Sequence, residues 1–433
     1  MRMLFNPLIK SQRSDIECPA FVSMPKKSLQ KKDRQQIMTA QMEKAEKKIF
    51  ATLFFSIFTT ITGVGIVVPL LPVYAHDMGA SGLYIGLLFG AFSMSRTFFL
   101  PYFGRYSDRW GRKPFIVTGL LGYSLVSFAF ITVSNVEMLI AIRFIQGIAS
   151  AMIWPVTQAY VGDLTPEKRE GFVMGLFNMS TFIGLSIGPL LGGTLSDRFG
   201  LNTAFITMGI LSFFSFLFSL ILLPPIGSEQ MSSRGRLPVP WIMLMKDREI
   251  DGIVLFRFVY TACIGIIWGF LPVFASAEFK LSASSIGILV MVGVFTSGAL
   301  QIPMGYIADR RNKKGMIIIG GLLVTCSMFL FEWAAGFRDL FSANILFGLG
   351  GSMSMAPLMA IAVQKGAQTK AMGSVMALLT MGHSMGMMAG AFLAGILMDL
   401  FEMRKIFSFG AGMMTLGLVL FLFCTAQRRN VCK

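Results

Sequence analysis

The sequence predicts an all-α integral membrane protein in which twelve helices cross the bilayer as two six-helix bundles, arranged as parallel repeats. Three observations lead to this fold class: an apolar composition, twelve blocks of membrane-crossing length, and residue types that recur in the two halves of the chain. Of the 433 residues, 54% are hydrophobic and 14% are charged, whereas an ordinary soluble domain has about a quarter charged residues. Hydrocarbon rather than water is therefore the main solvent expected for this chain.

The apolar blocks are long enough to span a bilayer. A helix needs about 20 apolar residues to cross the hydrocarbon core, and twelve blocks of that length are separated by short polar breaks. Their length and near absence of charge are typical of transmembrane helices. The predicted spans are residues 50–75, 82–103, 114–134, 138–161, 172–195, 202–223, 252–275, 284–307, 315–335, 339–363, 371–398 and 405–424.

Charge along the chain predicts orientation. The segments after the even-numbered spans, together with the C-terminal tail, hold 19 Lys and Arg residues, and the alternate loops hold 5 when Lys405, the first residue of the last span, is counted with them. Because cytoplasmic loops carry an excess of Lys and Arg, both termini are predicted to be cytoplasmic, in a multi-pass protein of the plasma (inner) membrane. The basic residues behind the net charge of +16 are therefore expected to set the membrane orientation and to interact with anionic lipid, and not to bind nucleic acid.

The same pattern predicts the domain organisation. A cytoplasmic tail, a first bundle, a cytoplasmic linker, a second bundle and a short cytoplasmic tail are expected over residues 1–49, 50–223, 224–250, 251–424 and 425–433. The first of these has no signal-peptide pattern, because its apolar stretches are short and charge is spread throughout it.

Distinctive residues recur about 200 positions apart, which indicates an internal repeat. The offsets lie between 200 and 202, as small loop insertions would produce. Parallel repeats are one plan of secondary transporters, with the substrate site near the bilayer midplane between the halves. The pairs are Pro72 with Pro272, Gly86 with Gly287, Gly104 with Gly305, Asp108 with Asp309, Arg109 with Arg310, Gly147 with Gly348, Pro155 with Pro357 and Asp197 with Asp399.

The stretch GRYSDRWGRKP, residues 104–114, forms the turn between the second and third spans. Gly104 lets helix backbones approach closely, and Gly111 permits a tight turn that a residue with a Cβ would resist. Asp108 can pair with Arg112, or it can sit at the N-terminus of a neighbouring helix, where the helix dipole favours an anion.

The fifth span carries three glycines at a spacing of four. Gly184, Gly188 and Gly192 therefore lie on one helix face and form a groove for a partner helix. Pro189 removes one helical hydrogen bond and can kink the span. The eleventh span repeats the pattern imperfectly as Gly382, Gly386 and Gly390.

Three stretches resemble motifs of the major facilitator superfamily and occur in the order expected there. They are GRYSDRWGRKP, RFIQGIASA at 143–151 and GLSIGPLLGG at 184–193. The third resembles the motif of the drug:proton antiporter branch, and its residues here are Gly184, Gly188, Pro189, Gly192 and Gly193. The resemblance covers roughly residues 50–424 and implies a twelve-helix exporter of the multidrug efflux type.

The resemblance implies a gating role for the first turn, through Gly104, Asp108, Arg109, Gly111 and Arg112. Asp108 is expected to contact the start of the eleventh span, near Ala371, when the two halves close on the cytoplasmic side. Such a latch would stabilise the outward-facing state. The second copy of the turn, GYIADRRNKK, keeps Gly305, Asp309 and Arg310, but it has Asn312 where a glycine is expected.

Arginines inside spans are the candidates for proton coupling. A charge in the bilayer is costly and is expected to face the protein interior. The resemblance implies this role for Arg143, with Gln146 beside it. The alternative is that Arg143 is a snorkelling or structurally paired arginine. Arg96 is a similar candidate, but it does not belong to any of the three motifs. Coupling also needs a carboxylate that changes protonation, and the candidates are Asp108, Asp163 and Glu332. The first span has none, which favours neutral, apolar or anionic substrates over multivalent cations.

In the family, helices 1, 4, 7 and 10 line the cavity, which implies a set of polar or aromatic cavity residues. They are Thr62, Gln146, Trp154, Gln158, Tyr260, Trp268 and Asn344, each of which can instead be a packing residue. Met381 and His383 could suggest Cu(I), but they lie about 200° apart on a helix, and no metal site is predicted.

The predicted function is secondary active, proton-coupled export of small amphipathic compounds by alternating access. An uptake symporter or facilitator of a small metabolite is the alternative, and a non-transporting receptor or lipid scramblase on the same fold is an alternative of another class. A monomer is expected, with a small-molecule substrate, membrane lipid and no cofactor beyond the proton. Neither an enzyme nor ATP-driven transport is expected, because no nucleophile has a base at helical spacing and no GxxxxGK[ST] string occurs.

Overall fold

The computed structural model describes residues 48–164, 170–224, 244, 246–369 and 372–425. Within these residues the regular structure is entirely helical, and twelve helices are long and apolar enough to cross a membrane. All twelve predicted spans are thus confirmed. The predicted tails and most of the predicted linker lie outside the described residues.

The first span runs over Lys48–Asp77 and is interrupted by a turn at residues 68–69. Beyond that turn it continues as α2 (Leu70–Asp77). The other helices of the first half are α3 (Gly82–Trp110), α4 (Arg112–Ala129) with the short helix η1 (Phe130–Thr132), α5 (Val136–Leu164), α6 (Glu170–Phe199) and α7 (Leu201–Leu222).

The second half contains α9 (Arg248–Phe279), α10 (Ala283–Arg310), α11 (Lys313–Glu332), α12 (Phe337–Gln368), α13 (Met372–Leu400) and α14 (Lys405–Thr425). Several helices are longer than their apolar blocks. With 32 residues, α9 is about 48 Å long, whereas the hydrocarbon core is about 30 Å thick. Polar residues at its ends can therefore lie outside the hydrocarbon.

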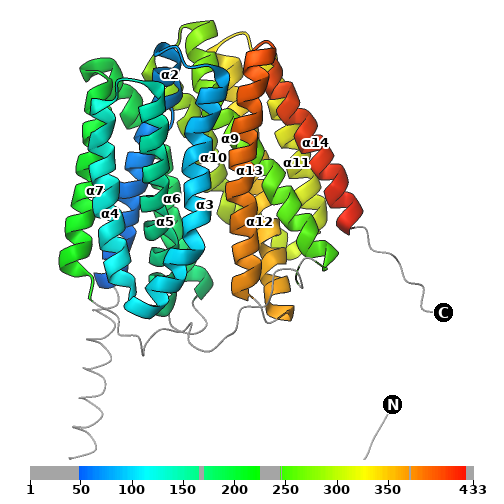
Figure 1. The fold of residues 1–433 in the computed structure, drawn as a ribbon. Coiled ribbons are helices and arrows are strands. Elements are labelled where there is room, and N and C mark those ends of the chain that lie inside the picture. Colours follow the sequence, from blue (N-terminus) through cyan, green and yellow to red (C-terminus); the bar gives the residue numbers. More distant parts are fainter. Residues whose placement is uncertain (1–47, 165–169, 225–243, 245, 370–371, 426–433) are drawn as a thin grey trace, which may run out of the picture. The chain divides into compact units, whose positions relative to one another are not determined.

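Two helix pairs join the halves. α3 packs between α5 of its own half and α13 of the other half, and α10 packs between α12 and α6 in the same manner. Figure 1 shows α3 and α13 side by side in the middle of the bundle. Since α10 is the repeat of α3 and α13 is the repeat of α6, the two contacts are equivalent.

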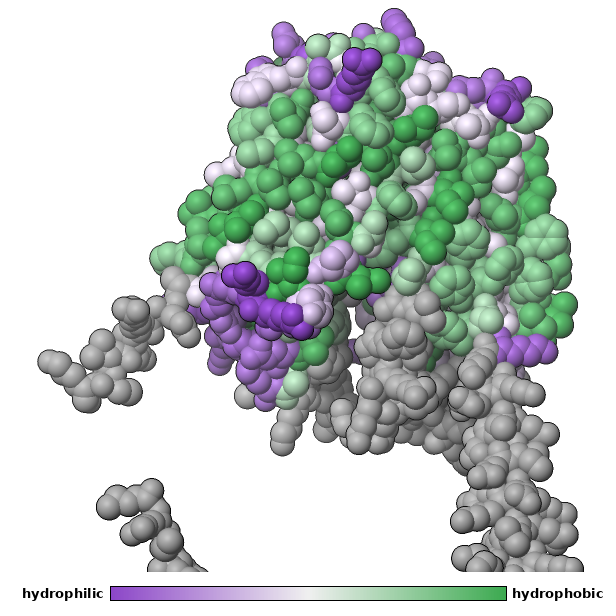
Figure 2. All heavy atoms as spheres, turned by 180° about the vertical axis from the view of Figure 1, so that it is seen from behind, coloured by the Kyte–Doolittle hydropathy of each residue, from purple (hydrophilic) through white to green (hydrophobic). Residues whose placement is uncertain are grey.

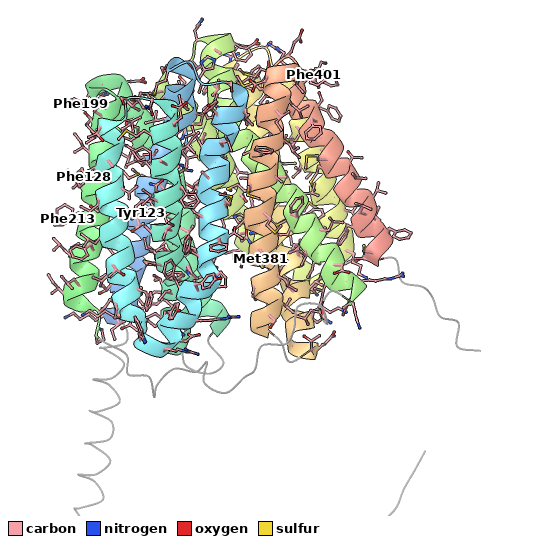
Figure 3. All side chains as sticks on the ribbon, viewed as in Figure 1. Tyr123, Phe128, Phe199, Phe213, Met381 and Phe401 are labelled. Atoms are coloured by element: carbon pink, nitrogen blue, oxygen red, sulfur yellow. The ribbon has the colours of Figure 1, made fainter. Side chains whose placement is uncertain are left out.

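The surface of the helices is suited to lipid. Figure 2 shows hydrophobic residues over most of the height of the bundle, with hydrophilic residues gathered at its two ends. Phe213 of α7 is 42% exposed and points away from the bundle in Figure 3. An apolar surface of this extent would be unstable in water, so the chain is a multi-pass membrane protein.

Candidate functional site

The turn between α3 and α4 has the geometry that its sequence predicted. Gly111 has φ +96°, a conformation that a residue with a Cβ rarely adopts. The Asp108 carboxylate and the Arg112 guanidinium form an ion pair. The Arg112 side chain is buried, and its Nη1 also donates to the Ser107 hydroxyl at 2.9 Å, whereas Arg109 is exposed. The turn is therefore held by a buried arginine that belongs to the motif itself.

The second copy of the turn is built differently. Asn312 has φ −65°, and its side-chain oxygen caps α11 by accepting from the backbone N–H groups of Lys314 and Gly315. An asparagine therefore replaces the glycine because this turn needs a helix cap and no positive φ. Asp309 is exposed, and the Arg310 guanidinium lies 3.9 Å from the centre of the Tyr306 ring.

The two turns lie at the same end of the bundle, which we call the basic end. We call the other end of the bundle the opposite end. At the opposite end the halves are in close contact. A Cβ on Gly86 of α3 would meet the backbone of Ala391 in α13, and a Cβ on Gly287 of α10 would meet the backbone of Pro189 in α6. Only glycine allows helices to approach this closely.

These contacts do not continue to the basic end. Further along α3, a Cβ on Gly90 would lie 3.9 Å from Met388 of α13, and at Gly104 no described atom lies within 4 Å. In α10, a Cβ on Gly298 would still meet Phe182 of α6, but Gly305 has no described neighbour within 4 Å. Close backbone contact through glycine is thus described at the opposite end, and no described atom makes such a contact with Gly104 or Gly305 beside the turns.

Two aspartates close the opposite end. The Asp399 carboxylate, in the last turn of α13, accepts hydrogen bonds from the backbone N–H groups of Gly82 at 2.6 Å and Leu83 at 2.9 Å, where α3 begins. The Asp197 carboxylate, in the last turn of α6, accepts from Ala283 at 3.1 Å and Ser284 at 2.8 Å, where α10 begins. Each half therefore caps a helix N-terminus of the other half.

Sequence reasoning found these aspartates but not their role. Asp197 and Asp399 stood out only as a repeated pair. Repetition of an exposed acidic residue at a helix C-terminus was the available signal, because a carboxylate there is unfavourable for its own helix dipole. Such a carboxylate is stabilised when it lies beside the N-terminus of a neighbouring helix, as both aspartates do here.

The glycine stripes of α6 and α13 pack against the first helix of each half. A Cβ on Gly188 would lie 2.5 Å from the carbonyl oxygen of Thr62 and 2.7 Å from the Cα of Gly65. Gly184 and Gly192 face Phe58 and Ile66 of the same helix, and Gly193 faces Ala283 of α10. In the second half, Gly382, Gly386 and Gly390 face α9 from Val254 to Ala262 in the same way.

Arg143 is buried in α5 and is satisfied by the protein. Its Nε donates to the Leu88 carbonyl at 3.2 Å, and its Nη1 donates to the Gln146 side-chain oxygen at 2.8 Å. The guanidinium also lies over the Phe92 ring, 4.5 Å from its centre. The structure thus brings Arg143 and Gln146 together, as predicted. Arg96 of α3 makes no hydrogen bond with the described part of the chain.

The predicted coupling carboxylates are not gathered around Arg143. Glu332, at the end of α11, is buried and pairs with Lys405 of α14 at 2.8 Å; it also accepts from Ser408. This network joins α11 to α14 within the second half. The side chain of Asp163 lies outside the described residues.

The predicted cavity residues have different surroundings. Thr62 is buried between the first span and α6, and its hydroxyl donates to the Phe58 carbonyl at 2.7 Å. Asn344 is buried and donates to the Leu340 carbonyl at 2.9 Å. The ring of Tyr260 is stacked on Phe347 of α12, and Trp154 packs against Phe177 of α6. Gln158 and Trp268 are half-buried.

Comparison with known proteins gives two matches to the Major Facilitator Superfamily, over residues 53–264 and 253–431. The chain is 29% identical to an MFS-type transporter of Methanocaldococcus jannaschii over 374 residues, which is 86% of this chain and 96% of that protein. It is 27% identical to multidrug resistance protein 2 of Bacillus subtilis over 387 residues, covering 86% and 94%. With quinolone resistance protein NorA of Staphylococcus aureus it shares 32% identity over 177 residues, covering 41% and 45%.

Solved structures share the fold. The nucleoside transporter NupG matches with a TM-score of 0.74 at 15% identity, over 88% of this chain and 100% of that chain. The human organic anion transporter MFSD10 (TETRAN) matches with a TM-score of 0.63 at 20% identity, over 87% and 99%. Twelve membrane-length helices in two repeated halves, packed together at one end, define a membrane transporter. The chain belongs to the Major Facilitator Superfamily, a family of transporters rather than enzymes.

Substituting Gly188 by Ala is expected to destabilise the protein by about 1–3 kcal/mol, because the new Cβ would overlap backbone that cannot move away cheaply. The thermal unfolding of the purified protein in detergent measures this. Gly412→Ala in α14 is the matched control, since no described atom lies within 4 Å of a Cβ there. Equal melting temperatures for the two variants would contradict the packing described.

Replacing both Asp197 and Asp399 by Asn is expected to loosen the opposite end. Each carboxylate caps an exposed helix N-terminus and is worth up to about 1 kcal/mol, so the double variant should shift the equilibrium toward opening there by roughly tenfold. Pulsed electron paramagnetic resonance between spin labels at positions 135 and 402, in a cysteine-free background, reports the distance across this end.

Asp339→Asn is the control for that experiment, because the Asp339 carboxylate caps Ala335 within its own half. It should leave the distance distribution unchanged. A double Asp197/Asp399 variant with the wild-type distribution would show that these contacts do not hold the end closed.

Proposed function

We propose that this chain exports small amphipathic compounds across the plasma membrane by alternating access, driven by proton entry. The observation that carries this proposal is the one-sided contact between the halves. The pairs α3–α13 and α6–α10 are in close backbone contact through glycine at the opposite end, and the described residues make no such contact with Gly104 or Gly305 beside the two turns. With the basic end in the cytoplasm, as the positive-inside rule implies, the described state is inward-facing and both termini are cytoplasmic.

The outward-facing state would follow from a rocking motion of the halves that closes the basic end. In the described state Asp108 is paired with Arg112 of its own turn. Closure would bring this turn to the start of α13, where Asp108 would cap a helix N-terminus as Asp399 caps α3 at the opposite end. The latch predicted from the sequence is thus the counterpart of a contact that exists on the other side.

Export, rather than uptake, is supported by the antiporter-type glycine stripe of α6 and by the relative named as a multidrug resistance protein. Arg143 is the proposed centre of proton coupling, since it is buried beside the contact between α3 and α13 and bonded to the backbone of α3. Asp108, Asp163 and Glu332 remain the proposed proton-carrying carboxylates; Asp108 and Glu332 are ion-paired with Arg112 and Lys405 in the described state.

Purified protein in liposomes with an acidic lumen tests the function. Internal pH is followed with trapped pyranine while rhodamine 123, Hoechst 33342 or fluorescein is added outside. Substrate-dependent proton release supports antiport. Substrate movement that is indifferent to the gradient would indicate a facilitator, and no movement of any probe or lipid would indicate a receptor.

Arg143→Gln is expected to lower substrate-dependent proton release by about tenfold or more, because the charge that couples proton and substrate is removed. Facilitated substrate movement without a gradient should persist. Arg338→Gln, which removes an exposed arginine at the start of α12, should leave proton release unchanged. Full coupling in the Arg143 variant would exclude that role.

A further inference from the structure

A second group of basic side chains lies in the interior of the bundle, on three different helices. Arg96 of α3, Arg257 of α9 and His383 of α13 each have a buried ring or guanidine nitrogen without a hydrogen-bond partner. His383 lies within electrostatic reach of both arginines. The three residues come from both halves of the transporter.

Packing of the helices accounts for this convergence. A Cβ on Gly386 of α13 would overlap Phe258 and Thr261 of α9, which places the segment around Arg257 against the segment around His383. α13 also packs on α3 through Gly86 and Ala391. Arg96 is the middle residue of α3 (Gly82–Trp110), about 21 Å from either end of that helix, so the group lies deep in the membrane.

The hydrogen bonding of this group differs from that of Arg143. Arg143 has a carbonyl and an amide oxygen as acceptors. Among the described residues, the only hydrogen bond of the Arg257 side chain is from its Nη1 to the Met355 thioether at 2.8 Å, and sulfur of this kind is a weak acceptor. Buried donors that lack acceptors cost free energy. Among the described residues, Arg143 therefore has oxygen acceptors, whereas the half-buried Arg96 and Arg257 have none.

No acidic side chain among the described residues compensates this charge within the spans. Every described Asp or Glu lies in a loop or in the first or last turn of its helix. Those within helices are Asp77, Asp108, Glu137, Asp163, Glu170, Asp197, Glu249, Asp251, Glu278, Asp309, Glu332, Asp339 and Asp399; the side chains of Asp163 and Glu170 lie outside the described residues. The described interior is thus positively charged, which is costly unless an anion enters it.

We propose that Arg96, Arg257 and His383 bind the anionic group of the transported compound, a carboxylate, sulfonate or phosphate on an apolar body. This inference rests on the proposed transport function and specifies its substrate class. A guanidinium binds such oxyanions through two parallel hydrogen bonds, and the imidazole adds a further donor. A lipid phosphate lies at the bilayer surface, whereas this group lies near the middle of α3, so the ligand is an organic anion that enters the bundle.

Methionines around the group suit an apolar body of variable shape. Met355 of α12 contacts Arg257, and Met388 of α13 is the neighbour of Gly90 in α3. Figure 3 shows Met381, two residues before His383, part-way along α13 rather than at either end. Flexible thioether side chains adapt to different ligands. The site would therefore require a negative charge on the substrate but accept apolar bodies of different shapes.

Equilibrium binding of a matched pair of probes tests this site. Fluorescein and rhodamine 123 share a xanthene ring system and carry opposite charge, and their anisotropy reports binding to the full chain in phosphatidylcholine nanodiscs. The wild-type protein is expected to prefer fluorescein. Arg96→Gln and Arg257→Gln should each weaken fluorescein binding by about tenfold or more and leave or improve rhodamine binding. Arg338→Gln, the surface control, should change neither.

Thermal unfolding without a probe provides a second measurement. Because the two interior arginines have unmade hydrogen bonds, Arg96→Gln and Arg257→Gln are expected to leave the melting temperature unchanged or raise it. Arginines that only stabilise the fold would lower it. Unchanged fluorescein affinity in both folded variants, or a wild-type preference for rhodamine 123, would overturn the proposed site.

The binding measurement does not depend on transport, so the two proposals fail separately. If fluorescein binding is lost in the variants and no probe moves in the liposome assay, the anion site is supported and the export function is contradicted. Gradient-driven transport in the liposome assay, with fluorescein affinity unchanged in both folded variants, would support the exporter and contradict the anion site.

Discussion

The capping of helix N-termini across the interface is the interaction on which the described state depends. The first N–H groups of a helix lack acceptors within that helix, and the dipole adds positive charge there. Asp399 and Asp197 supply the missing acceptors at the start of α3 and α10. Such bonds involve few atoms near water and are worth about 1 kcal/mol each. They can therefore close one end of a transporter and still be broken in every cycle.

The antiparallel course of the paired helices gives this interaction a counterpart at the basic end. α3 and α13 each carry an aspartate near the C-terminus, Asp108 and Asp399, and the Asp399 carboxylate contacts the N-terminus of α3. Asp399 makes its contact in the described state, in which Asp108 forms an ion pair with Arg112. In the proposed cycle one contact is exchanged for the other. The glycines between them allow the helices to pack closely when an end closes and cost no side-chain contacts when it opens.

Features that depend on local sequence were predictable, and features that depend on distant partners were not. The twelve spans follow from length and charge, and the positive φ of Gly111 and the Asp108–Arg112 pair involve residues a few positions apart. The partner of Asp399 is 317 residues away, and nothing in either segment specifies the other. Thr62 shows the same limit: its polarity suggested a cavity position, but the sequence did not show that helix rotation places its backbone carbonyl against Gly188 of α6 and that its hydroxyl donates to the Phe58 carbonyl. Single residues do not encode that rotation.

The proposed anion site and the two ends of the transporter are linked through the cost of buried charge. While the basic end is open, water can solvate Arg96 and Arg257. Rocking passes through a state in which both ends exclude water, and unpaired guanidinium groups would raise the free energy of that state. A bound oxyanion supplies acceptors and opposite charge, and so lowers this barrier for the loaded protein alone. Arg143, which already has its acceptors in Leu88 and Gln146, imposes no such requirement. The unequal hydrogen bonding of these arginines would thus make the substrate-carrying step conditional on bound substrate, while the return step would carry the proton; an exchanger needs such conditions to avoid leaking its driving gradient.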